Sequence, residues 1–209
     1  MILTAIEESG RYKGRFELFF EDGTRLVSTA SVIAEYYLYA GKDISDEVLA
    51  ALRTGFGREE TRRKARVMID RRAYSKREVY QKLLEKDEKP EAAAEAVDWL
   101  EELGLLDDAE YAAMVVRHYG AKGYGARRVT QELHRRGVDK ELWDRALLEM
   151  PDQEDELGRF IRSKLGGGLP DRKERKRISD ALARRGYGWD EINSALRRYE
   201  EQVEEEGYE

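Results

Sequence analysis

The chain has 209 residues, of which 39% are charged and 41% are hydrophobic, so the high charge is accompanied by enough apolar surface for a buried core. Acidic side chains outnumber basic ones by 44 to 38, which gives a formal net charge of −6. Because there is no cysteine and there are two histidines, the sequence excludes disulfides, thiolate zinc sites and cysteine nucleophiles, and leaves almost no material for a histidine metal site or a catalytic triad.

The start of the sequence has neither the basic segment nor the long apolar segment of an export signal. Its apolar stretches also fall far short of the roughly 20 residues that a membrane-crossing helix needs. We therefore predict a cytoplasmic protein without membrane contact.

Residues 1–57 are predicted to form an accessory segment that contains a small β-meander and two short helices. The turn residues Asp22-Gly23 separate two stretches typical of strands, and a third such stretch precedes them. Ser31 and Ser45 are the predicted N-caps of the two helices. The predicted strands cover residues 3–7, 15–20 and 24–27, and the predicted helices cover residues 31–39 and 45–52.

From residue 58 onward the sequence predicts three tandem copies of a three-helix repeat. Apolar pairs at helical spacing recur at intervals of 50 and 49 residues: Val79 and Leu83, Val129 and Leu133, Ile178 and Leu182. A second amphipathic pattern follows each pair in the third helix. We expect a mainly α protein whose repeats, at residues 58–106, 107–150 and 151–209, form an elongated, curved body; the last repeat ends in an acidic tail.

Capping residues and helix breakers divide each repeat into its helices. The predicted starts are the capping box Ser75–Glu78 and Pro90 in the first repeat, Asp107 or Asp108 and Asp139 in the second, and Pro151, Pro170 and Trp189 in the third. The predicted breaks are at Gly104, Gly123-Tyr124-Gly125, Gly137, Gly166-Gly167-Gly168 and Gly186.

Basic and acidic residues alternate along the repeats. Residues 58–86, 114–137 and 159–187 carry net charges of +6, +5 and +7, and the segments that follow them carry −9, −6 and −6. Each basic segment is centred on a second helix. A row of such helices suits phosphates or an acidic protein groove, and pairing between neighbouring helices explains the pattern equally well.

The short motifs give no sign of catalysis. Gly123-Tyr124-Gly125 lacks the third glycine and the preceding strand of a dinucleotide site, and no Gly-Lys-Ser/Thr follows Gly166-Gly167-Gly168. His118 and His134 lie on different predicted helices without acidic partners at ligand spacing. We predict a protein that is not an enzyme and needs no cofactor or metal.

Several segments of the sequence resemble the RecX family of RecA regulators. The resemblance rests on residues 74–79 (YSKREV), 103–112 (LGLLDDAEYA), 122–129 (KGYGARRV) and 132–138, and it extends over roughly residues 58–200. The N-terminal segment is similar to the extension of RecX proteins of Gram-positive type. Ala126 stands where the family often has proline, and the third repeat is the loosest match.

The resemblance implies a regulator that binds the RecA–DNA filament, modulates its assembly and limits ATP hydrolysis, strand exchange and repressor cleavage. It implies RecA as the partner, with single- or double-stranded DNA bound more weakly alone, and we predict a monomer. A helical transcription regulator without a recombinase partner, or a helical adaptor, is the alternative. From the charge pattern we select candidate contact residues: Arg71, Arg72, Lys76, Arg77, Lys122, Arg127, Arg128, Arg135, Arg136, Arg172, Lys173, Arg175, Lys176, Arg184 and Arg185.

Overall fold

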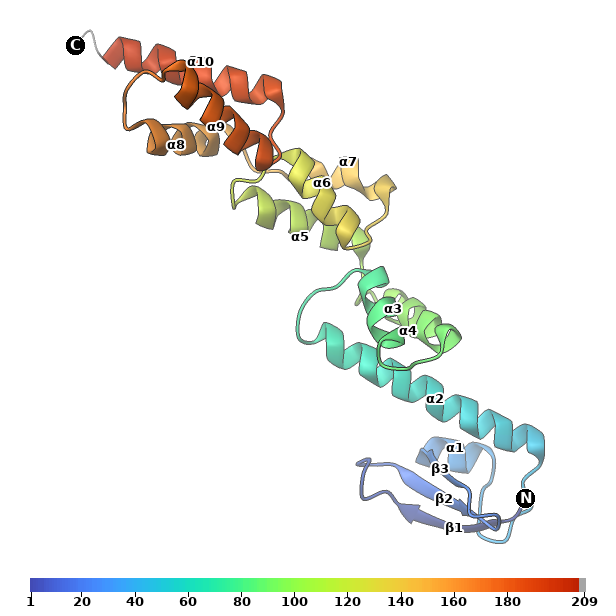
Figure 1. Ribbon diagram of the computed structural model, residues 1–209. Helices are drawn as coiled ribbons and strands as arrows, with labels where there is room; N and C mark the ends of the chain where they lie inside the picture. Colours follow the sequence, from blue (N-terminus) through green and yellow to red (C-terminus); the bar gives the residue numbers. More distant parts are fainter. Residues whose placement is uncertain (207–209) are drawn as a thin grey trace. The chain divides into compact units, whose positions relative to one another are not determined.

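The computed structural model describes residues 1–206 and confirms a mainly helical chain with a small sheet at its N-terminal end (Figure 1). In chain order the elements are β1 (Leu3–Glu8), β2 (Phe16–Phe20), β3 (Arg25–Ser28), α1 (Ala30–Glu35), α2 (Asp46–Ile69), α3 (Lys76–Leu84), α4 (Pro90–Glu102), α5 (Asp108–Gly120), α6 (Ala126–Arg135), the 3₁₀ helix η1 (Lys140–Leu142), α7 (Trp143–Leu147), α8 (Glu154–Leu165), α9 (Arg172–Arg184) and α10 (Trp189–Glu206).

The chain divides into two compact units, which we describe separately. The N-terminal unit consists of Met1–Arg72 together with Tyr80–Leu103. The C-terminal unit consists of Ala73–Val79 and the chain from Gly104 onward. The first turn of α3 therefore belongs to the C-terminal unit, and the rest of α3 belongs to the N-terminal unit.

The predicted meander at the start of the N-terminal unit is confirmed. The strands form an antiparallel sheet in the order β1-β2-β3, and Gly23 adopts a positive φ of 82° in the turn between β2 and β3. One face of the sheet buries Leu3, Leu18 and Phe20 against the start of α2. The sheet is thus stabilised by a helix, as a sheet of this size requires.

The predicted break between the helix at residues 45–52 and the first helix of the repeat that begins at residue 58 is wrong. A single 24-residue helix, α2, runs through Gly55 and Gly57. Its first half packs on the sheet through Leu49 and Leu52, and its second half packs on α4, where Ala65 is fully buried. Because each half of the helix buries one face, packing outweighs the unfavourable helix propensity of two glycines, about 1 kcal/mol each. The boundary predicted at residue 58 lies inside this helix.

Repeats 2 and 3 are two three-helix bundles within the C-terminal unit, as predicted. Repeat 2 packs α5, α6, η1 and α7 around Val129 and Leu133, and repeat 3 packs α8, α9 and α10 around Ile178 and Leu182. These anchor side chains are at most 1% exposed, so the repeated apolar pairs identified the core face of each second helix.

Several helix starts differ from the predicted ones. Thr29, not Ser31, caps α1. The helix α8 starts at Glu154, three residues after Pro151; its N-cap, Gln153, makes no side-chain cap, and Asp152 accepts from the Glu154 amide. Asp171 forms a capping box with Glu174, so α9 starts after Pro170. The predicted N-cap roles of Ser45 and Ser75 are confirmed, and Asp107 is the cap of α5.

The acidic residues at the end of the chain are not a separate tail. The helix α10 continues to Glu206, so the acidic side chains from Glu200 onward extend its last turns. Residues 207–209 of the predicted tail lie outside the described residues.

Candidate functional site

In the C-terminal unit the second helices of successive repeats meet end to end. At the α6–α9 joint, the Gly125 amide donates to the Arg185 carbonyl oxygen at 3.0 Å, and the Arg127 amide donates to the Gly186 carbonyl oxygen at 3.1 Å. The start of α6 therefore lies directly against the end of α9 (Figure 1). A Cβ on Gly186 would lie 2.4 Å from the Arg128 nitrogen, so this contact requires glycine.

The α3–α6 joint repeats this arrangement one repeat earlier. The Ser75 hydroxyl donates to the Arg136 carbonyl oxygen at 2.5 Å, and the side chain of Arg77 lies against Gly137. Gly137 has a positive φ of 71°, and Gly186 has one of 94°. In both joints, a glycine with positive φ follows the second helix of one repeat and packs against the first turn of the second helix of the preceding repeat.

A buried polar network stabilises the α3–α6 joint. The Arg136 guanidinium donates to Glu132 at 2.7 Å and to the Tyr111 hydroxyl at 2.6 Å, and that hydroxyl donates to Glu78 at 2.7 Å. Arg135 forms a second, bidentate pair with Glu132.

The network shifts the pKa values of two of its members. Hydrogen bonds from Arg135, with further ones from Tyr119 and Arg136, lower the pKa of Glu132 to about 2. Desolvation raises the pKa of the Tyr111 hydroxyl. Two predicted contact residues, Arg135 and Arg136, are therefore engaged within the fold.

The stability of the protein is expected to fall in acid because of Glu132. Its folded pKa of about 2 lies below its usual 4.5, so its contribution is fully present above pH 4.5 and is lost as the pH falls through 2. We expect about 2 kcal/mol from this group, allowing for its exposed partner Arg135. Urea unfolding at pH 7, 5, 3 and 2 should show a weaker pH dependence for Glu132→Gln than for the original chain. The exposed Glu141→Gln is the control, and equal pH dependence of all three proteins would contradict the prediction.

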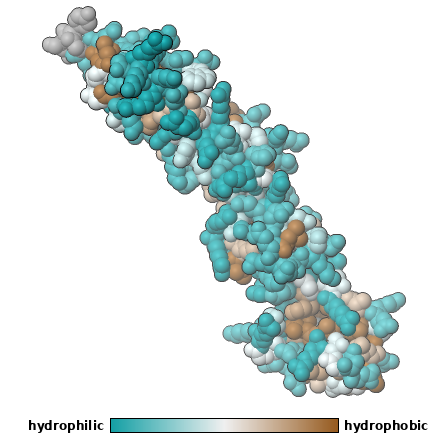
Figure 2. All heavy atoms as spheres, in the orientation of Figure 1, coloured by the Kyte–Doolittle hydropathy of each residue, from teal (hydrophilic) through white to brown (hydrophobic). Residues whose placement is uncertain are grey.

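The solvent-facing side of α9 is rich in cations. Five cations lie on the side of the helix opposite Ile178 and Leu182, with Asp180 among them. They are Arg172, Lys173, Lys176, Arg177 and Arg184, all exposed. Within residues 1–206, none of these side chains has a hydrogen bond or ion pair. Figure 2 shows hydrophilic side chains over the visible side of α9. Unlike Arg136, these cations are available to a partner.

Arg127 extends this surface across the α6–α9 joint. Its side chain is exposed and, among the described residues, has no hydrogen bond or ion pair. Its neighbour Arg128 packs its stem on Gly186 and reaches Gln131 at 3.5 Å. We call Arg127 and the five exposed α9 cations the cationic face.

The other predicted contact residues are placed differently. Arg175 forms an ion pair with Glu200 of α10, and Arg185 stacks on the Phe160 ring at 4.6 Å. Lys122 lies over the Tyr119 ring at 5.8 Å. Arg71 and Arg72 belong to the N-terminal unit, where both are exposed after the end of α2, and Lys76 and Arg77 lie in the first turn of α3.

Sequence reasoning missed Arg177. It belongs to the run Arg172–Arg177 and precedes the anchor Ile178 by one residue. A helical projection from that anchor places position 177 on the exposed side and position 175 nearer the core. The anchor therefore contained the signal that separates Arg177 from Arg175.

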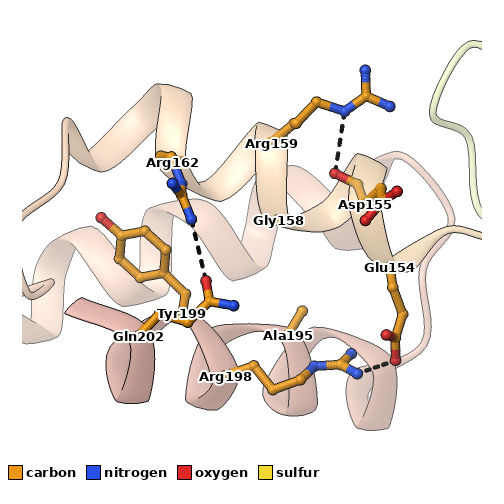
Figure 3. A pocket seen from close by; sticks show the side chains of 9 residues that line it. All are labelled: Glu154, Asp155, Gly158, Arg159, Arg162, Ala195, Arg198, Tyr199 and Gln202. Atoms are coloured by element: carbon orange, nitrogen blue, oxygen red, sulfur yellow. Dashed lines mark hydrogen bonds and ion pairs between the residues drawn. The ribbon is translucent and has the colours of Figure 1, made fainter. Parts of the chain in front are cut away.

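A groove between α8 and α10 contains three arginines, and each of them already has a partner (Figure 3). Arg198 pairs with Glu154, Arg159 pairs with Glu156, and Arg162 donates to the Gln202 side chain at 3.2 Å. Because these guanidinium groups already have partners within repeat 3, the groove is a weaker candidate for an anionic partner than the cationic face.

Two other classes of site are absent from residues 1–206. No helix in this range is both long and apolar enough to span a membrane. The same residues contain no cluster of three or more His, Asp or Glu side chains placed to hold a metal ion.

Comparisons with known proteins place both bundles of the C-terminal unit. Residues 107–147 match the model of the second three-helix domain of RecX, and residues 155–196 match that of the third. The regulatory protein RecX of Xanthomonas axonopodis pv. citri (strain 306) is 37% identical over 132 residues, which are 62% of this chain and 82% of that protein. The regulatory protein RecX of Vibrio campbellii is 34% identical over 131 residues, covering 62% and 84%.

Two crystal structures share the fold. One, of a regulatory protein RecX, superposes with a TM-score of 0.75 at 19% identity, covering 94% of this chain and 98% of the other. The RecX structure from Lactobacillus salivarius superposes with a TM-score of 0.64 at 20% identity, covering 68% and 96%. The first of these likenesses spans nearly the whole chain, so it also includes the N-terminal elements.

Proposed function

The chain belongs to the RecX family of regulatory proteins, and from this we propose that it binds the RecA–DNA filament through its cationic face and thereby limits the ATPase, strand-exchange and coprotease activities of RecA. The observation that carries the proposal is the set of six cations without side-chain partners among residues 1–206, which lie on the two domains that match the family. A RecA–DNA filament offers both phosphates and acidic side chains to such a surface.

The distribution of charge disfavours a transcription regulator that reads DNA with the third helix of each repeat. The segment 188–209, which contains α10, carries a net charge of −6, whereas α7 is neutral, with Asp144 and Arg145 as its charged residues. Phosphates would repel α10 and would not be attracted by α7, whereas the second helices attract them. The cations therefore lie where they can contact an anionic surface without placing a third helix in a DNA groove.

The proposal is tested by titrating the protein into a RecA ATPase assay on single-stranded DNA. Lys173→Glu/Arg177→Glu reverses two cations of the face that have no partner among the described residues, so the melting temperature should stay within about 2 °C while the inhibitory concentration rises at least tenfold. The control Lys140→Glu/Arg145→Glu makes the same charge change at exposed residues of repeat 2 outside the face, and it should inhibit like the original chain.

Three outcomes would contradict the proposal. The original chain could leave RecA ATPase unchanged at every ratio, which would remove the recombinase partner. The two double variants could weaken inhibition equally, which would mean that only the overall charge matters. The variant Lys173→Glu/Arg177→Glu could also be well folded and inhibit fully, which would mean that Lys173 and Arg177 are solvent-exposed residues with no part in inhibition.

A further inference from the structure

We propose that the N-terminal unit has a separate surface that binds single-stranded nucleic acid, formed by the β1–β2 hairpin and the middle of α2. Cations and aromatic rings alternate along this surface. It is distinct in position from the cationic face and does not depend on the RecA contact proposed above.

The tip of the β1–β2 hairpin presents two exposed cations, Arg11 and Lys13, on either side of Tyr12. The Ser9 hydroxyl oxygen accepts from the Arg11 amide at 3.3 Å and from the Tyr12 amide at 3.2 Å, and the hydroxyl donates to Glu17 at 2.8 Å. These bonds define the conformation of the tip. No acidic residue occurs between Ser9 and Phe16, so the tip is locally positive although residues 1–57 are acidic as a whole.

Tyr12 connects the hairpin to a groove beside α2. Its ring lies edge-on to the Phe56 ring, with the centroids 6.0 Å apart. Phe56 lines a groove of about 550 Å³ between α2 and the segment formed by β3 and α1. Apolar side chains gather where α1 and β3 face α2 in Figure 2. The groove can therefore receive a flat apolar group next to a ring.

Arg62 lines the same groove, six residues after Phe56 on α2, and has an unsatisfied donor. Its Nε is buried and has no hydrogen-bond partner, and its guanidinium lies over the Trp99 ring at 5.3 Å. A buried donor without a partner is costly, so a rotation of the Arg62 side chain that brings its guanidinium to an acceptor in the groove would be favourable. Two carboxylates line the groove: Glu59 is paired with Arg15, and Glu35 is exposed at the end of α1.

The alternation favours a single strand over other anions. Arg11, Lys13 and Arg62 can each meet a phosphate, and Phe56 offers a base a stacking partner in the groove between them. In a duplex the faces of the bases are stacked on one another, so the rings would have no partner. A lone carboxylate on a peptide would satisfy Arg62 but would leave the hairpin cations and the rings without a role.

The test measures the anisotropy of a fluorescein-labelled 20-residue oligothymidylate with the full chain at 50 mM salt and without RecA. Arg11→Glu/Lys13→Glu should weaken binding at least tenfold and lower the slope of log K against log salt by about 0.7 for each lost contact. The control Lys86→Glu/Lys89→Glu has the same charge change on exposed residues of the same unit, and its affinity should stay within twofold of the original.

Two further variants test the groove. Phe56→Leu keeps an apolar side chain but removes the ring, and Arg62→Met keeps the stem but removes the donors. Each should weaken binding about fivefold while the protein still unfolds in a single cooperative thermal transition. The proposal is overturned if the chain does not bind the oligothymidylate or if the hairpin and control variants weaken binding equally. It is also overturned if a duplex of equal length binds as tightly, or if a polyglutamate peptide displaces the oligothymidylate at equal charge concentration. Unchanged inhibition of RecA by the hairpin variant would keep the two proposals separate.

Discussion

Replacing Gly186 with alanine is expected to destabilise the C-terminal unit by about 2–4 kcal/mol. Two effects add at this position. Gly186 has a φ of 94°, in a region that costs an L-residue roughly 1–2 kcal/mol. Its Cβ would also lie 2.4 Å from the Arg128 nitrogen and 2.5 Å from the Arg128 Cβ, so the α6–α9 joint must open, at a cost of about 1–3 kcal/mol.

Gly167→Ala separates these two effects. Gly167 has nearly the same φ, 95°, but nothing lies within 4 Å of the Cβ that alanine would add. It should therefore show the conformational cost alone, about 1–2 kcal/mol, and urea unfolding of the three proteins measures the difference. Equal losses of stability in the two variants would mean that the joint does not form in solution as described.

The repeat architecture could be predicted because each second helix has its own apolar anchors. Leu133 and Leu182 are fully buried at the predicted positions, and Gly137 and Gly186 end their helices as predicted. Such features are local, since helical spacing and a left-handed glycine depend on a few neighbouring residues. The starts of α8 and α9 were less predictable, because proline and the capping residue compete within three positions.

The continuity of α2 and the two joints could not be predicted in the same way. Gly55 and Gly57 have low helix propensity, and the packing of both halves of the helix outweighs it. The joints depend on contacts between residues about 60 positions apart, such as Ser75 with Arg136 and Gly125 with Arg185. Nothing in the spacing of the repeats specifies which ends of the helices meet.

The candidate site shows why charge counts alone are insufficient. Arg135, Arg136 and Arg175 contribute to basic segments in the sequence, yet each pairs with a glutamate in the structure. Arg177 was left out although its side chain is exposed and unpaired among residues 1–206. A side chain is available to a partner only when its own fold does not already use it. That property depends on neighbouring helices, which the charge of one segment does not contain.

Leu133→Ala is expected to be the most destabilising substitution in repeat 2, with a loss of about 2–5 kcal/mol. Leu133 is fully buried in the core of that repeat, where Val129 and Val138 belong to the same cluster. The substitution removes apolar contacts and leaves a cavity that a three-helix bundle fills only in part. The control Leu148→Ala changes a leucine of the same repeat that is 84% exposed, and it should alter the free energy of unfolding by less than about 0.5 kcal/mol. Urea unfolding at pH 7 compares them, and a similar small loss in both variants would show that Leu133 is not a core residue in solution.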